Sequence, residues 1–373
     1  MSLAVSGAQS KQIVDTRFMN LALALGRRGL GRTWPNPAVG AVLVKDGAIV
    51  GRGWTQAGGR PHAEPEALRR ACEAARGATM YVTLEPCSHY GKTPPCADAI
   101  VAAGVARVVS AIEDPNPEVA GQGHARLRAA GIAVDVGICA DEARRDHAGH
   151  IRRMRDGRPH VMLKLAVSAD GKAGAAGRKP IPITGEAARE RVHLLRARSD
   201  AIMIGIGTAL ADDPLLTCRL PGMGKISPVR VVLDSTLRLR PESRLVKSAR
   251  EVPLWMIAAA DAPKAREDAL RAHGVEVLRS AGSAGRLDLS VMLKLLAARG
   301  VTRLMVEGGP TLASALLAAD LVDEAQLFHS QRVVGADGID ALDANAAAAL
   351  GRQLRPTGSE PAGSDRLDSY QRG

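Results

Sequence analysis

The chain is poor in aromatic side chains, has few cysteines and contains no long apolar run. Three Trp, three Tyr and two Phe among 373 residues are too few for the stacking surfaces of RNA and single-strand binders. Five cysteines without dense spacing do not make the disulfide framework of a small secreted domain. No run approaches the ~18 apolar residues of a membrane span, and Met1–Lys11 lacks the features of a secretory signal. We therefore expect a cytoplasmic protein with neither membrane nor nucleic-acid partners.

What the chain does contain is the composition of a folded two-domain protein with an excess of positive charge. Apolar residues make up 46% and charged residues 24%, which argues against disorder. A length of 373 residues suffices for two domains with separate cores. The formal charge of +11 favours anionic ligands, and small phosphorylated molecules fit this composition better than nucleic acid does.

The first half alternates between helical and strand-like segments, which predicts a sheet covered by helices. Two strands, Ala38–Val44 and Ala48–Trp54, flank Lys45-Asp46-Gly47, and Asp-Gly tolerates the positive φ angles of a tight hairpin. The remaining pattern predicts helices over Asp15–Arg28, Ala63–Arg76, Cys96–Ala103 and His124–Ala130, and strands over Thr79–Leu84, Arg107–Ile112 and Ile132–Val136.

An arginine-rich stretch, Asp141–Arg158, is interpreted as a helix plus connector between domains. We therefore expect one domain over residues 1–147 and another over residues 158–373. The segment Pro356–Ser364 is rich in Pro, Gly and Ser and predicts a mobile loop. The second α/β series is predicted to have helices over Glu186–Arg196, Lys264–Ala272, Leu289–Ala298, Thr311–Ala318 and Ala341–Leu350, and strands over His160–Val167, Ala201–Ile204, Val229–Leu233, Leu254–Ile257, Val275–Leu278 and Arg303–Val306.

Ligand-type side chains gather in two short segments of the first domain. His62-Ala63-Glu64 opens one predicted helix, and Pro86-Cys87 is expected to open another directly after a strand. With Cys96, the imidazole and two thiolates make three ligands of a tetrahedral zinc site and leave a fourth position for water. This order resembles the zinc-deaminase signature H-x-E then P-C-x-x-C, although Cys96 stands nine residues after Cys87 rather than three. In that chemistry Glu64 moves protons between the water and the substrate.

Simpler interpretations exist for each part of this motif. A His-Ala-Glu triplet alone is commonly a solvated helix start, and two cysteines at this spacing are commonly unrelated. A purely structural zinc is another alternative, because such sites have four protein ligands and His89 is available as the fourth.

The second domain contains a candidate phosphate-binding turn. The strand Arg303–Val306 runs into Glu307-Gly308-Gly309-Pro310-Thr311. Glycines there let a ligand approach the backbone, and a helix start offers free N–H groups. An ordinary strand-to-helix turn explains the same local pattern. Gly205-Ile206-Gly207-Thr208 has only part of a dinucleotide-binding fingerprint.

The first half contains a series of short motifs: Pro35-Asn36-Pro37, Val39-Gly40, His62-Ala63-Glu64, Glu85-Pro86-Cys87-Ser88-His89, Gly91-Lys92-Thr93-Pro94-Pro95-Cys96 and Asp114-Pro115-Asn116-Pro117. With these motifs it resembles the deaminase domain of the bifunctional riboflavin-biosynthesis deaminase/reductase family. That resemblance implies a cytidine-deaminase-like α/β/α fold acting on 2,5-diamino-6-(5-phosphoribosylamino)pyrimidin-4-one. It implies zinc on His62, Cys87 and Cys96, with Glu64 as the proton shuttle, and a homo-oligomer.

The second half contains the motifs Lys164-Leu165, Asp170-Gly171, Asp212-Asp213-Pro214-Leu215-Leu216-Thr217 and Glu307-Gly308-Gly309-Pro310-Thr311. With them it is similar to the reductase domain of the same family, which implies a dihydrofolate-reductase-like fold. The resemblance implies that NADPH reduces the ribosyl group, giving 5-amino-6-(5-phosphoribitylamino)uracil. It also implies that Ala166, Thr208, Asp212, Ser235, Gly309, Pro310 and Thr311 contact NADPH, and that Arg196, Leu216, Arg219 and Glu307 contact the substrate, the arginines at its phosphate.

One departure from the family pattern leaves alternatives open. Where the family usually has a serine, a spacer and a tryptophan, this chain has Pro180-Ile181-Pro182. An enzyme active only as the deaminase is therefore the first alternative. A nucleic-acid deaminase, suggested by the charge and the zinc motif, is the second, and a non-catalytic zinc scaffold is the third.

Overall fold

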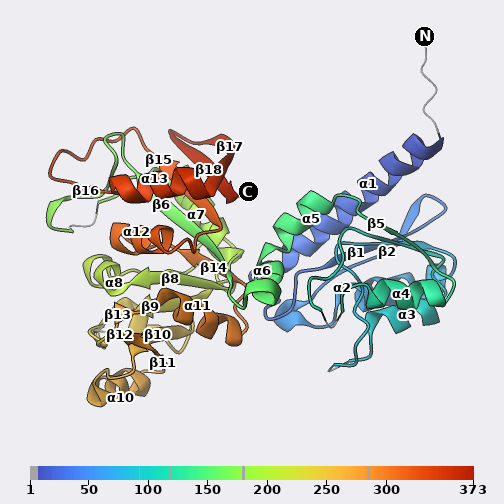
Figure 1. The fold of residues 1–373 in the computed structure, drawn as a ribbon, viewed down its shortest axis with the longest axis horizontal. Helices are drawn as coiled ribbons and strands as arrows, with labels where there is room; N and C mark the ends of the chain where they lie inside the picture. Colours follow the sequence, from blue (N-terminus) through green and yellow to red (C-terminus); the bar gives the residue numbers. More distant parts are fainter. Residues whose placement is uncertain (1–6, 92, 118, 179–180, 284–285) are drawn as a thin grey trace, which may run out of the picture. The chain divides into compact units, whose positions relative to one another are not determined.

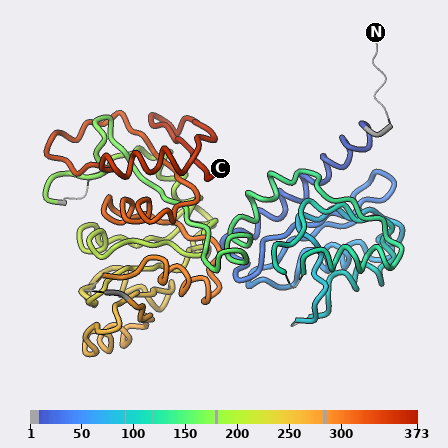
Figure 2. Tube along the Cα trace, in the orientation of Figure 1, coloured from blue at the N-terminus to red at the C-terminus, as the bar shows by residue number. Residues whose placement is uncertain are grey.

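The computed structural model describes residues 7–91, 93–117, 119–178, 181–283 and 286–373. The chain divides into two compact units, Met1–Gly157 and Arg158–Gly373. In Figure 2 the trace from blue to green forms the first unit, and the trace from green to red forms the second. No helix in the described ranges is long and apolar enough to cross a membrane.

The first unit is a three-layer α/β/α arrangement. Its described residues form a five-stranded sheet in the order β2-β1-β3-β4-β5, with helices on both faces (Figure 1). Strands β3, β4 and β5 run parallel, and β1 is antiparallel to β2 and β3. The elements are α1 (Gly7–Gly26), η1 (Arg27–Gly29), β1 (Gly40–Lys45), β2 (Ala48–Trp54), η2 (Ala57–Gly59), α2 (Ala63–Ala71), η3 (Cys72–Ala75), β3 (Thr79–Val82), α3 (Cys96–Ala102), β4 (Arg107–Ser110), α4 (Gln122–Ala129), β5 (Ala133–Val136), α5 (Ala140–Asp146) and α6 (Ala148–Asp156).

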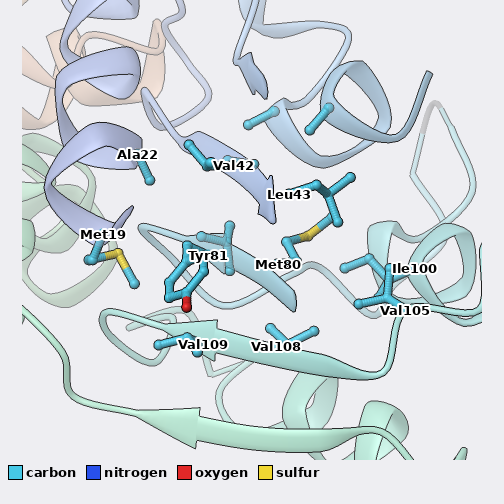
Figure 3. Close-up of a cluster of buried hydrophobic side chains, with 14 of the residues drawn as sticks. Met19, Ala22, Val42, Leu43, Met80, Tyr81, Ile100, Val105, Val108 and Val109 are labelled. Atoms are coloured by element: carbon cyan, nitrogen blue, oxygen red, sulfur yellow. The ribbon is translucent and has the colours of Figure 1, made fainter. Parts of the chain in front are cut away.

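Alternating side chains of the central strands build the core on both faces of this sheet. Met80 and Tyr81 are neighbours on β3 and therefore point to opposite faces. Figure 3 shows Tyr81 near Met19 of α1, and Met80 near Ile100 of α3. The Tyr81 hydroxyl donates to Asp15 at 2.8 Å, so the strand is also hydrogen-bonded to α1.

The second unit is built on a larger sheet. Its described residues give a nine-stranded sheet in the order β11-β10-β9-β8-β14-β6-β15-β18-β17. All neighbours from β11 to β15 are parallel, whereas β18 and β17 are antiparallel additions. The elements are β6 (His160–Val167), β7 (Lys172–Gly174), η4 (Ala176–Arg178), α7 (Glu186–Ala197), β8 (Ala201–Gly205), α8 (Ile206–Asp212), β9 (Val229–Leu233), α9 (Arg244–Lys247), β10 (Leu254–Ala259), α10 (Lys264–Ala272), β11 (Glu276–Ser280), β12 (Gly282–Ser283), β13 (Arg286–Leu287), α11 (Leu289–Ala298), β14 (Arg303–Val306), α12 (Pro310–Ala318), β15 (Glu324–His329), β16 (Ile339–Asp340), α13 (Ala344–Gln353), β17 (Leu354–Ala362) and β18 (Asp365–Arg372).

The expected loop at Pro356–Ser364 is wrong. Most of this segment belongs to β17, which forms a hairpin with β18 at the end of the sheet. An edge strand tolerates proline, because the missing N–H can face away from its single partner strand. Gly363 supplies the positive φ of 71° in the tight turn between the two strands.

Three helix predictions also need correction. The helix expected over Ala63–Arg76 ends at Ala71, because Cys72 adopts a positive φ of 49° and a short 3₁₀ turn follows. The charged segment Asp141–Arg158 holds two helices, separated at His147, rather than one. The helix expected from Ala341 begins at Ala344, where the Asp343 carboxylate caps it by accepting from the Ala346 N–H at 2.8 Å.

Candidate functional sites

The first site is formed where helix α2 is held close against β2. An added Cβ at Gly53 would lie 2.2 Å from the carbonyl oxygen of Ala63, and one at Gly51 would lie 2.4 Å from that of Ala67. Both positions therefore need glycine for the helix to pack directly on the strand. This packing places His62 immediately before α2 and buries Glu64 in its first turn.

The structure brings the three predicted metal ligands together. His62 Nδ1 lies 3.3 Å from Cys96 Sγ and 3.8 Å from Cys87 Sγ. Tetrahedral zinc with Zn–S near 2.3 Å and Zn–N near 2.0 Å requires N-to-S separations of about 3.5 Å. The two observed distances bracket that value, so the donor set and its spacing fit a zinc ion.

Cys87 is placed differently from the sequence expectation. No helix begins at Pro86-Cys87: these residues lie in a loop, and the helix α3 begins only at Cys96. The helix start still stabilises the thiolate, because the Cys96 backbone N–H donates to Cys87 Sγ at 3.3 Å. Hydrogen bonds from Cys96 and His62 lower the pKa of the Cys87 thiol to about 4. The pKa of Cys96 is raised by its hydrogen bond to Cys87 and by burial.

Glu64 is the carboxylate next to this cluster. Burial raises its pKa to about 7, although the nearby His62 acts in the opposite direction. A carboxyl group with such a pKa can both accept and return a proton at neutral pH.

His89 does not join the cluster as a fourth ligand. Among the residues that the structure describes, the group around His62 contains only Cys87 and Cys96 as further ligands, all within 4.8 Å of one another, and His89 is exposed. Three protein ligands are the pattern of a catalytic zinc with an open position, rather than of a closed structural zinc.

Glu85, two residues before Cys87, carries a structural role that the sequence analysis did not assign. Its buried carboxylate accepts four backbone N–H groups, from Asp114 at 3.1 Å, Gly121 at 3.0 Å, Gly123 at 2.8 Å and His124 at 3.2 Å. The start of α4 is thereby held against the segment that carries Cys87. A buried acid directly after a β-branched strand was the available signal.

The second site lies where parallel strands of the second unit end. Because carboxyl ends of parallel strands meet at one sheet edge, residues that follow neighbouring strands lie close together. Most of the predicted contact residues follow this rule: Ala166 near the end of β6, Thr208 after β8, Ser235 after β9, and Glu307, Gly309, Pro310 and Thr311 after β14.

The Gly309 turn has the geometry of an anion-binding helix start. Gly309 precedes α12 with no side-chain cap, and Pro310 occupies the first turn. The Gly309 N–H donates to Thr208 Oγ1 at 3.2 Å, which joins the turn to α8. An added Cβ at Gly309 would lie only 3.2 Å from the same hydroxyl. Pro310 has no N–H, and the Leu312 N–H donates to the Gly309 carbonyl at 3.1 Å. In this first turn the Thr311 N–H is therefore the group left for a phosphate.

Glu307 forms a half-buried charge cluster beside that turn. Its carboxylate accepts from Arg196 Nη2 at 2.8 Å and from Lys164 Nζ at 3.5 Å. Burial alone would raise the pKa of Glu307, but the charges of Lys164 and Arg196 lower it. The same cluster affects Asp212, whose pKa is raised by burial and by the Glu307 charge.

The arginines predicted to bind phosphate are held by this cluster. Arg196 Nη1 also donates to the Thr217 carbonyl at 3.1 Å, which fixes the chain between Leu216 and Arg219. Leu216 is buried with a positive φ of 56°. The Arg219 side chain forms no ion pair with any described residue, and burial together with Arg196 and Arg244 lowers its pKa. The positive charge of Arg219 is therefore suited to bind an anionic ligand.

Lys164 and His193 are two polar groups that sequence reasoning left without a role. His193 Nδ1 accepts the Arg219 backbone N–H at 3.4 Å. The signal for Lys164 was a lysine within the strand His160–Val167, whose other residues after His160 are all apolar. Nothing in the local sequence points to His193.

The unusual proline segment is only partly described. Pro180 and the motif residue Lys92 lie outside the described residues. Pro182 is exposed, and its carbonyl accepts a hydrogen bond from Arg332.

Family models of known proteins match both units. A family model described as the cytidine and deoxycytidylate deaminase zinc-binding region matches residues 12–112, and one described as the RibD C-terminal domain matches residues 159–367. Riboflavin biosynthesis protein RibD of Escherichia coli (strain K12) is 45% identical over 335 residues, covering 87% of this chain and 89% of that protein. The Aquifex aeolicus protein of the same name is 42% identical over 322 residues, covering 86% of this chain and 88% of that protein.

Solved structures resemble nearly the whole chain. RibD of Acinetobacter baumannii has a TM-score of 0.86 at 36% identity, covering 97% of this chain and 99% of its own. A diaminohydroxyphosphoribosylaminopyrimidine deaminase/5-amino-6-(5-phosphoribosylamino)uracil reductase from Thermotoga maritima has a TM-score of 0.83 at 33% identity, covering 97% of this chain and 100% of its own. The expected fold class, cytidine-deaminase-like followed by dihydrofolate-reductase-like, is confirmed.

The zinc assignment predicts which cysteines hold metal. Cys96→Ser should lower bound zinc from one ion per chain to well below half, because it removes a buried thiolate ligand. Cys72→Ser should keep the full ion, since Cys72 is exposed and lies after the end of α2, at the opposite end of that helix from His62. Elemental analysis of the purified, dialysed proteins measures both values. Equal zinc in the two variants would contradict the assignment.

Proposed function

Because the chain belongs to the RibD family of riboflavin-biosynthesis proteins, we propose that it catalyses the two reactions in the name of its Thermotoga maritima relative. Residues 1–147 would remove an amino group from 2,5-diamino-6-(5-phosphoribosylamino)pyrimidin-4-one. Residues 158–373 would then reduce the ribosyl group with NADPH, giving 5-amino-6-(5-phosphoribitylamino)uracil. The observation that supports the proposal best is the approach of His62, Cys87 and Cys96 beside the buried Glu64.

In the deamination, water replaces the amino group, which leaves as ammonia. Zinc held by His62, Cys87 and Cys96 would supply Lewis acidity that makes water nucleophilic at neutral pH. Glu64 would pass the first proton of the water to the ring nitrogen of the substrate, and then carry the second proton, from the added hydroxyl, to the departing amine. Its buried position next to the ligand cluster suits both transfers.

In the reduction, a hydride and a proton are added to the ribosyl group, and NADPH supplies the hydride when bound. Gly309, Pro310 and Thr311 would hold its pyrophosphate, with Thr208 fixing their turn. Ala166, Asp212 and Ser235 would complete the cofactor contacts. Glu307 would orient Arg196, and Leu216 and Arg219 would face the phosphorylated substrate.

The family resemblance also supports a cytoplasmic homo-oligomer whose ligands are small phosphorylated molecules. The charge of +11 suits both anionic ligands of the proposed reactions. An enzyme with only the first activity remains the alternative, because Pro180 and Pro182 replace the serine and tryptophan usual in the family.

The role of Glu64 predicts a selective loss of deamination. Glu64→Gln should lower the deamination rate by about 10²–10⁴-fold, because the amide cannot carry the proton. The variant should still bind one zinc and still reduce the deaminated ribosyl compound with NADPH. Mass spectrometry of the products, with zinc analysis of the same sample, measures these properties. Full deaminase activity in this variant would show that another group moves the proton or that the zinc is only structural.

The role of Arg219 predicts a substrate-binding defect in the reductase half. Arg219→Ala should raise the KM for the phosphorylated substrate about tenfold or more, because it removes charged hydrogen bonds. The KM for NADPH should stay within twofold. Arg352→Ala, which removes an exposed charge from α13, is the matched control. An increase confined to the KM for NADPH would place Arg219 at the cofactor instead.

A further inference from the structure

Two buried histidines connect the last helices of the first unit to its two central parallel strands. His147 lies between α5 and α6, and its Nε2 is 3.1 Å from Thr83 Oγ1, just past the end of β3. His150 lies in α6, and its Nε2 is 3.0 Å from Asp114 Oδ1, in the segment that follows β4. The His150 and Asp114 side chains are only 9% and 10% exposed. Neither histidine takes part in the proposed reactions.

The His150 contact has a defined donor and acceptor. Asp114 Oδ1 already accepts the Asn116 N–H at 2.9 Å. An ionised carboxylate can only accept, so the Nε2 of His150 must carry the proton and donate it. The other ring nitrogen, Nδ1, is buried and has no hydrogen-bond partner among the described residues.

Packing alone does not explain this imidazole. A buried polar atom without a partner costs stability, and an apolar side chain of similar size would avoid that cost. What an apolar side chain could not supply is the hydrogen bond to Asp114. We therefore take the role of His150 to be the hydrogen bond that it donates to the Asp114 carboxylate.

Asp114 is linked to the metal-binding segment through Glu85. The Asp114 N–H donates to Glu85 Oε2 at 3.1 Å, and Glu85 precedes Cys87 by two residues. An added Cβ at Gly123 would lie 2.0 Å from the Pro86 carbonyl oxygen, so the start of α4 also presses on the same backbone. Holding Asp114 therefore fixes one side of the segment that carries Cys87.

We propose that His150 is a positioning residue for the deamination: its Nε2–H holds the Asp114 carboxylate, and thereby keeps Asp114–Pro117 and Glu85 packed against the Cys87 segment. The inference rests on the proposed function for its kinetic consequence. Its structural consequence, the order of Asp114–Pro117, does not depend on which substrate is used. His147 contacts Thr83, just after β3, and so supports the other end of the chain that leads to Cys87.

Three substitutions in the full-length, zinc-loaded protein test the role. His150→Leu fills the space without a donor, whereas His150→Gln retains an N–H donor at similar reach. Arg155→Ala changes an exposed position of the same helix and is the matched control. The readouts are zinc per chain, kcat and KM for deamination, NADPH-dependent reduction of the deaminated compound, and hydrogen exchange of peptides covering Asp114–Pro117.

We expect His150→Leu to lower the kcat/KM of deamination at least fivefold and to speed hydrogen exchange in Asp114–Pro117. Zinc should remain at one per chain, and reduction should stay within twofold. His150→Gln should recover at least half of the lost activity and slow the exchange again, and Arg155→Ala should match the parent protein.

Activity of His150→Leu within twofold of the parent, or unchanged exchange in Asp114–Pro117, would overturn the proposal. Equal impairment of the Gln and Leu variants would overturn it too, because packing rather than the donor would then matter. If the Leu variant does not fold, the Gln variant decides: parental activity supports the proposal, and loss of activity in a folded protein refutes it. A parent protein that binds zinc but does not deaminate would instead refute the proposed function, while the exchange data still report on His150.

Discussion

Both sites depend on one constraint, that parallel strands end at the same edge of a sheet. In the first unit the ends of β3 and β4 lead to Cys87 and Asp114. In the second unit the ends of β8, β9 and β14 lead to Thr208, Ser235 and Glu307. Residues far apart in sequence are therefore close together where neighbouring strands end. The helices that start at the same edge add backbone N–H groups, one of which, from Cys96, donates to the Cys87 thiolate.

A buried carboxylate, Glu85, and a half-buried one, Glu307, fix these edges in two different ways. Glu85 is satisfied by four backbone N–H groups, so it orders the chain around the metal ligands without needing a cation. Glu307 is satisfied by Arg196 and Lys164, so it orders side chains that face the proposed substrate. A buried charge must be paired or hydrogen-bonded, and in each unit that requirement determines the shape of the site.

The sequence was most informative where chemistry depends on residue type and order. The ligands His62, Cys87 and Cys96, and Glu64 beside them, could be recognised from the sequence alone, because few other functions require these residue types in this order. Strands such as Val229–Leu233 and helices such as Lys264–Ala272 were predicted with their observed bounds. The hairpin β17 and β18 was missed because local composition favours a loop at Pro356–Ser364, and only pairing at the sheet edge overrides it. For Glu85 the one signal was an acidic residue directly after a strand. His193 and His150 could not be recognised, since their partners lie 26 or more residues away.

The most direct test of the account is the mass spectrum of products formed by the purified protein from the diaminopyrimidine ribosylamino phosphate and NADPH. The account predicts the ribitylamino uracil phosphate, with one NADPH oxidised and one ammonia released per molecule formed. Accumulation of the deaminated ribosyl compound would contradict the reductase half and favour the deaminase-only alternative. Unchanged substrate in a zinc-loaded protein would contradict the central claim that both steps belong to this chain.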